Sequence, residues 1–268
     1  MMKGYLAVFK LRIHTGLQYR AAALAGIGTQ FFFGFMFIMI FQAFYSHATQ
    51  EPPMTLSQVV TYTWLKQGFL SLVVLWLRDS ELFQLITSGN ISYELCRPSG
   101  LYGLWYAKLL AQRLSSAMLR CLPILIIVWF LPEPYGLQLP PDFATFLLFL
   151  AVLLAGLLMI VAISMLIYIS VFVTMSPVGS LLLFSVFGEF FAGLIIPVPL
   201  MPGWMQKIVY ALPFHWTADF PFRVFTGNLS KVEAVQGLCF QLIWLAVLVG
   251  IGKLAMDKAL RRVVVQGG

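Results

Sequence analysis

The hydrophobic positions of the chain gather into six long runs separated by short polar stretches. A bilayer core of about 30 Å needs about 20 mostly apolar residues in a helix. The sequence shows no strands of alternating polarity of the outer-membrane kind, so the predicted fold class is an all-α membrane protein. The six transmembrane helices are predicted over residues 21–45, 57–77, 103–131, 143–173, 178–196 and 234–256.

Two further segments are amphipathic without being apolar enough to span. Residues 1–20 carry apolar side chains every three or four positions, at Leu6, Phe9 and Ile13. This spacing predicts an N-terminal interfacial helix; a ragged start to the first span is the alternative. Residues 202–232 are too polar to span and too apolar for a free loop, so we expect short outer helices there, packed on the outer face of the bundle before span six.

A polar, turn-rich segment, residues 79–100, separates the second and third predicted spans. Ser80 can cap a short helix, Gly89 is suited to end it because glycine readily adopts left-handed geometry, and Pro98 breaks the backbone again. A loop that only joined two antiparallel spans could be about 4 to 6 residues long. The longer segment predicts an ordered docking surface; a tolerated insertion is the alternative.

Basic residues orient the predicted spans. With both termini in the cytoplasm, twelve of the 17 lysines and arginines fall on the cytoplasmic side, three outside and two within spans. Cytoplasmic loops carry an excess of these residues, so segment 79–100 is predicted to be cytoplasmic, and Lys108 and Arg113 are expected at that surface. The twelve are Lys3, Lys10, Arg12, Arg20, Arg78, Arg97, Lys108, Arg113, Lys253, Lys258, Arg261 and Arg262.

Composition agrees with a membrane protein and argues against other classes. The 268 residues are 60% hydrophobic and 10% charged, and the mean hydropathy of +0.90 lies far above that of a soluble domain. The net charge of +7 does not indicate a nucleic-acid partner, because the chain has no basic, solvated domain. The three cysteines have no paired spacing, so neither a disulfide framework nor a metal site is predicted.

Motifs for catalysis are absent from the sequence. It contains no Gly-x-x-x-x-Gly-Lys-Ser/Thr phosphate loop and no Gly-x-Ser-x-Gly elbow. His215 and Asp219 stand one helical turn apart, a spacing that fits an ordinary polar face better than a site. We therefore expect a non-catalytic chain that binds no cofactor or metal and takes its energy from another chain.

Three ionisable residues fall inside predicted spans: Lys66, Arg120 and Glu189. A charge at the bilayer centre costs about 2.5 to 3.5 kcal/mol and is usually internal and paired. Counted from opposite faces of a core of about 30 Å, Lys66 and Glu189 lie at similar depths, so we expect an ion pair between them. The alternative is that Lys66 extends to the membrane interface and Glu189 is protonated. If Lys66 and Glu189 do not pair, Arg120 is the next candidate partner for Glu189.

Three motifs carry a resemblance to a known family. "SGNISYELCRPSGLYGLWYAK", "LPFHWTADFPFRVFTGNLS" and the terminal "RRVVVQGG" occur in this order. With the predicted helices, they resemble the ABC-2 type permease family of ATP-binding cassette transporters, as a single transmembrane domain over residues 1–268. The resemblance implies that segment 79–100 holds a coupling helix that sits in a cleft of an ATPase subunit. The residues that it would place in coupling are Leu82, Phe83, Ile86, Gly89, Tyr93, Glu94, Arg97 and Pro98.

The resemblance also implies a function. The chain would be the permease subunit of an exporter in the plasma (inner) membrane, working with a second permease, identical or paralogous, and with a dimer of ATPase subunits that binds Mg-ATP. Aromatic side chains are compatible with a hydrophobic or amphipathic substrate, although lipid-facing bulk explains each of them singly. The alternative is a protein that works without ATP: a channel, a secondary transporter or a scaffold. The aromatic residues are Phe31, Phe32, Phe33, Phe35, Phe190 and Phe191.

Overall fold

Helices make up all the regular structure in the part of the chain that the computed structural model describes, residues 2–18, 20–96 and 100–261. Four of these helices are long and apolar enough to cross a membrane. They match the first, third, fourth and sixth predicted spans, so the all-helical membrane class is confirmed. The four are α2 (Arg20–Ser46), α7 (Leu101–Trp129), α8 (Phe143–Thr174) and α12 (Lys231–Leu260).

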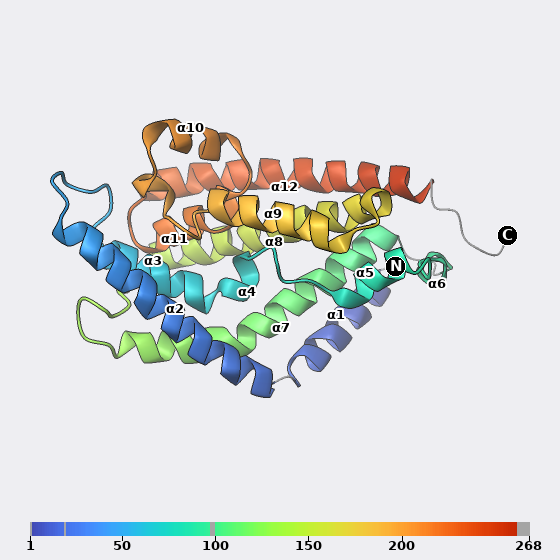
Figure 1. Ribbon diagram of the computed structural model, residues 1–268, viewed down its shortest axis with the longest axis horizontal. Helices are drawn as coiled ribbons and strands as arrows, with labels where there is room; N and C mark the ends of the chain where they lie inside the picture. The colour runs from blue at the N-terminus through green and yellow to red at the C-terminus, as the bar shows by residue number, and fades with distance from the viewer. Residues whose placement is uncertain (1, 19, 97–99, 262–268) are drawn as a thin grey trace.

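α8 is the central helix of the bundle (Figure 1). It runs beside α12 and also contacts α7 and α9 (Pro177–Phe191). Asp142 caps its first turn by accepting a hydrogen bond from the backbone nitrogen of Thr145, at 2.9 Å. At its other end, Met175 adopts φ of 50°, which turns the chain back into α9. The longest apolar run of the sequence therefore forms the core against which the other helices pack.

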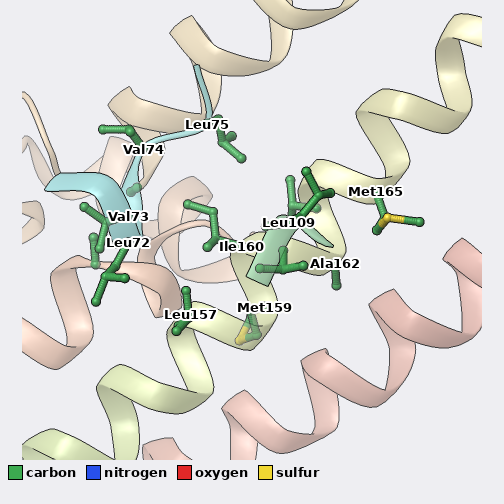
Figure 2. Close-up of a cluster of buried hydrophobic side chains, with 14 of the residues drawn as sticks. Leu72, Val73, Val74, Leu75, Leu109, Leu157, Met159, Ile160, Ala162 and Met165 are labelled. Carbon is green, nitrogen blue, oxygen red and sulfur yellow. The ribbon is translucent and has the colours of Figure 1, made fainter. Parts of the chain in front are cut away.

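The second predicted span is not one continuous helix. α3 (Leu56–Gly68) is followed by a single turn, α4 (Leu70–Val73), and the chain is not helical again until residue 80. The prediction of a helix through residue 77 was wrong. Residues 74–77 are apolar like the helix before them, so the hydrophobic pattern does not show where the helix ends. Figure 2 shows Leu72 and Leu75 from this segment in one buried cluster with Leu109 of α7 and with side chains of α8.

The fifth predicted span, 178–196, is also shorter in the structure. α9 has 15 residues, which correspond to about 22 Å at 1.5 Å per residue, less than a bilayer core of about 30 Å. Residues 192–196 are not helical. The four long helices are thus accompanied by two shorter apolar elements, and the count of six spans stays a prediction.

Short helices surround the long ones. α1 (Met2–Gly16) packs along α7, and its helical form agrees with the prediction for residues 1–20. Short helices are also present within 202–232: α10 (Gly203–Ala211) lies at the edge of the bundle in Figure 1, whereas α11 (Asp219–Phe225) packs inward against α8. One-turn 3-10 helices, η1 (Val198–Leu200) and η2 (His215–Thr217), lead into these two helices.

His215 and Asp219 have separate structural roles. The fully buried Asp219 accepts hydrogen bonds through Oδ1 from the hydroxyl of Tyr62 (3.1 Å) and from the backbone nitrogen of Val198 (2.9 Å). It therefore joins α3 to η1 and α11. The Nδ1 atom of His215 lies 3.1 Å from two backbone carbonyl oxygens, at Val209 and Leu212. Their one-turn spacing thus reflects two separate sets of contacts within the fold.

Candidate functional site

α5 (Ser80–Thr87) is a short amphipathic helix in the predicted docking segment. Its N-terminal cap is Asp79, whose Oδ1 accepts hydrogen bonds from the backbone nitrogens of Glu81 (3.0 Å) and Leu82 (3.3 Å). The predicted cap at Ser80 was wrong by one residue, since Ser80 is already the first residue of the helix. Gly89, with φ of +76°, turns the chain just after the helix, as predicted.

One face of α5 is buried against the bundle. Leu82, Phe83 and Ile86 are all buried, and the ring of Phe83 stacks on Tyr168 of α8 with centroids 4.3 Å apart. The hydroxyl of Tyr168 also accepts a hydrogen bond of 2.6 Å from the backbone nitrogen of Asp79. Three of the predicted coupling residues therefore connect α5 to α8 and do not face outward.

The opposite edge of this segment is exposed. Gly89 ends α5, and Tyr93 lies in α6 (Ser92–Leu95) with 73% of its surface exposed. Among the predicted coupling residues that the structure describes, these two are open to a partner. Arg97 and Pro98 lie outside the described residues. We call the exposed surface formed by Gln84, Ser88, Gly89, Asn90 and Tyr93 the α5–α6 edge.

Ion pairs join this segment to α1 and α7. Arg12 of α1 approaches Asp79, with 3.5 Å between Nη1 and Oδ2, and its Nη2 contacts Glu81. Lys108 of α7 places Nζ 3.7 Å from Oε1 of Glu81 and 3.5 Å from Oε1 of Glu94 in α6. These five residues form one charge cluster, so α1, α5, α6 and α7 are connected at one end of the bundle.

Burial makes part of the charge cluster costly to disrupt. Lys108 and Glu94 are 4% and 5% exposed, whereas the side chain of Glu81 is 55% exposed. An exposed pair contributes about 0 to 1 kcal/mol, but a buried charge that loses its partner destabilises a protein by about 3 to 5 kcal/mol. Lys108 is buried beside Glu94 and Glu81, and its level at the cytoplasmic surface stays a prediction.

Arg113, also predicted at the level of the cytoplasmic surface, is buried among the helices, with 2% of its surface exposed. Its Nη1 donates to the carbonyl oxygens of Ser71 (3.2 Å) and Val74 (2.6 Å), and its Nη2 donates to Oγ of Ser164 (3.0 Å). The broken second span leaves these carbonyls without helical partners, and the guanidinium supplies charged donors. A sequence signal exists, because Arg113 stands four residues after the buried Leu109, on the apolar face of α7.

The three ionisable residues predicted within spans meet at one place. Lys66 of α3, Arg120 of α7 and Glu189 of α9 all line a cavity of about 480 Å³, to which α2 contributes Gln30 and Phe37. We call it the charged cavity. Residues more than 120 positions apart in the chain are thus brought together around one space.

The predicted ion pair between Lys66 and Glu189 is not formed in the part of the chain that the structure describes. Nζ of Lys66 lies 3.6 Å from the centroid of the Phe37 ring, a cation–π contact. Oε1 of Glu189 is buried without a hydrogen-bond partner. Equal depth therefore brings both residues to the same cavity without bringing their charged atoms into contact.

The sequence matches a protein-family model over most of its length. Residues 31–267 match the model described as ABC-2 family transporter protein. A comparison with curated proteins found no match. The family match covers more than half of the chain, from α2 to beyond α12. The chain therefore belongs to the ABC-2 family of membrane transporter proteins.

Proposed function

We propose that the chain is the permease subunit of an ATP-driven exporter. It lies in the plasma (inner) membrane with both termini in the cytoplasm, and it works with a second permease, identical or paralogous. A separate dimer of ATPase subunits binds Mg-ATP and hydrolyses it. The exported substrate is hydrophobic or amphipathic. The α5–α6 edge carries this proposal, because it offers an exposed contact surface whose reverse side is fixed to the bundle.

The contacts of α5 give the proposal a mechanical basis. A partner that presses on Tyr93 displaces α6 and α5 together, because Lys108 contacts both Glu81 and Glu94. The displacement reaches α8 through the stacked rings of Phe83 and Tyr168. It reaches α1 through Arg12. Movement at the cytoplasmic contact is thereby passed to the helices that form the membrane part.

Purification of the tagged chain from its own cells in mild detergent tests the proposal. We expect a chain with a Gly-x-x-x-x-Gly-Lys-Ser/Thr phosphate loop to co-purify, together with ATP hydrolysis in the preparation. Tyr93→Ala should reduce both, whereas Phe130→Ala, which removes an 82% exposed ring at the other end of α7, should reduce neither. A stable preparation without ATPase would favour a channel, a secondary transporter or a scaffold.

The orientation is tested separately with thiols introduced into a cysteine-free parent. Ser88 and Gln50 are both exposed; Gln50 lies between α2 and α3, and Ser88 follows α5. A cysteine from Ser88→Cys should be protected from an impermeant reagent in right-side-out vesicles, and one from Gln50→Cys should react. The reverse labelling pattern would overturn the cytoplasmic position of the α5–α6 edge.

A further inference from the structure

The charged cavity contains two cations that lack a carboxylate partner. Lys66 is 5% exposed and contacts the ring of Phe37. The guanidinium of Arg120 lies against Gly26 of α2, where a Cβ atom would come within 2.9 Å of its Cζ. Among the described residues, neither cation forms an ion pair, although both line the same cavity. Charged groups away from water are costly unless they are paired, so the cavity favours a ligand with an anionic group.

The same cavity contains hydrogen-bond acceptors without donors. Oε1 of Gln30 and Oε1 of Glu189 are both buried without a partner. The orientation of the Gln30 amide is determined by its environment, because Nε2 donates to the carbonyl oxygen of Gln67 at 3.0 Å. A buried acceptor without a partner costs free energy. These two oxygens therefore favour a ligand that also carries N–H donors, and the carboxylate favours a positively charged one.

The wall of the cavity is apolar where it reaches the surface of the chain. Phe33, Trp76 and Ile195 line it and are 43%, 47% and 43% exposed. Three large apolar side chains at a mouth between membrane helices suit hydrocarbon better than water. A ligand can thus place a polar group among the charges and leave an apolar part outside.

We propose that the charged cavity binds the zwitterionic headgroup of an amphipathic molecule, one with a primary ammonium and a phosphate or carboxylate. The anionic group lies between Lys66 and Arg120, and the ammonium donates to Glu189 and Gln30. This inference rests on the proposed export function, for which it names the substrate class. The permease would then recognise a headgroup within the membrane part and leave the apolar tail in contact with lipid.

Binding of phospholipids to the purified chain, measured by native mass spectrometry, tests the inference. Phosphatidylethanolamine has both groups, phosphatidylcholine lacks the N–H donors, and phosphatidylglycerol lacks the cation. We expect phosphatidylethanolamine to bind about tenfold more tightly than either of the others, as the loss of one charge-assisted hydrogen bond predicts. Equal binding of the three lipids to the wild-type protein would overturn the inference without any variant.

Variants assign the preference to the cavity. Glu189→Gln should reduce the preference for phosphatidylethanolamine by about tenfold, and Lys66→Met should weaken the binding of all three phospholipids by about tenfold, because each carries the phosphate. Lys207→Met, at an exposed lysine of α10, should change neither. An unchanged preference in Glu189→Gln together with an unchanged affinity in Lys66→Met would contradict the assignment. Glycerophosphoethanolamine has the headgroup without the tails. If it displaces phosphatidylethanolamine at equal concentration, the cavity recognises a free zwitterion and not a lipid.

The lipid measurement needs neither ATP nor a partner chain. Loss of lipid discrimination in a preparation that retains its ATPase would therefore overturn only this inference. Failure to find an ATPase would overturn the export function and leave headgroup binding in place.

Discussion

Arg113 donates a hydrogen bond of 2.6 Å to the carbonyl oxygen of Val74, at the point where the second apolar run leaves helical geometry. A second bond reaches the carbonyl of Ser71. A residue 39 positions away in the chain thus satisfies the polar groups that the break exposes. In a membrane interior, where backbone groups have no water, such a break is stable only with a partner of this kind.

Removal of this donor should destabilise the bundle. We expect Arg113→Met to lower the free energy of unfolding by about 1 to 3 kcal/mol for each carbonyl left without a donor. Thermal unfolding in detergent, followed by tryptophan fluorescence, measures the effect. Arg20→Met, at an exposed arginine at the start of α2, is the matched control and should unfold like the wild type. Equal unfolding temperatures for the two variants would show that Arg113 is not needed at the break.

The buried pair of the charge cluster predicts a recovery in a double variant. Lys108→Met removes a buried cation that contacts both Glu94 and Glu81, so we expect it to lower stability. Replacing both residues, with Glu94→Gln, also removes the buried negative charge that Lys108 contacts and should restore part of the stability. Hydrogen exchange of residues 80–95 reports the effect locally. If the double variant lost as much protection as the sum of the two single variants, the pair would not be coupled.

Phe83 and Tyr93 should respond differently, although the resemblance assigns both to coupling. Phe83→Ala removes a buried ring that stacks on Tyr168, so we expect a loss of about 3 to 5 kcal/mol in stability. Tyr93→Ala removes an exposed ring, and stability should change by less than about 0.5 kcal/mol. Chemical denaturation of the two variants in the same detergent compares them. A large loss in Tyr93→Ala would mean that its ring is part of the fold and not free for a partner.

The cap of α8 should make stability depend on pH. A hydrogen bond from Lys231, with 2.9 Å between Nζ and Oδ2, and one from the Thr145 backbone hold the pKa of Asp142 below its ordinary value of 3.8. A pKa lowered by folding contributes stability above the unfolded value, and the contribution is lost as the pH falls through the folded value. The stability difference between wild type and Asp142→Asn should therefore begin to shrink as the pH falls below 3.8 and disappear below the folded pKa of Asp142. A difference that persisted unchanged at lower pH would contradict this role.

The sequence predicts the long helices and the short helix α5 well because their signals are local. The apolar run of α8 and the glycine that follows α5 need no knowledge of the rest of the chain. The break after Gly68 has no such signal, since its stabilising partner, Arg113, lies on another helix. Charge counting likewise gives no sign that Lys108 is buried against Glu94 of α6, because that contact joins residues of two different helices. The equal depths of Lys66 and Glu189 predict a shared location, whereas contact depends on side-chain directions that depth does not specify.

The central claim, that the α5–α6 edge contacts an ATPase, is tested most directly by crosslinking from Tyr93. A photoreactive side chain introduced by Tyr93→p-benzoylphenylalanine, in cells that contain the intact complex, should form a covalent adduct with a chain that carries a phosphate loop. The same substitution at Phe130, exposed at the other end of α7, should not form this adduct. An adduct from Phe130 and none from Tyr93, in a protein that still inserts and folds, would contradict the account.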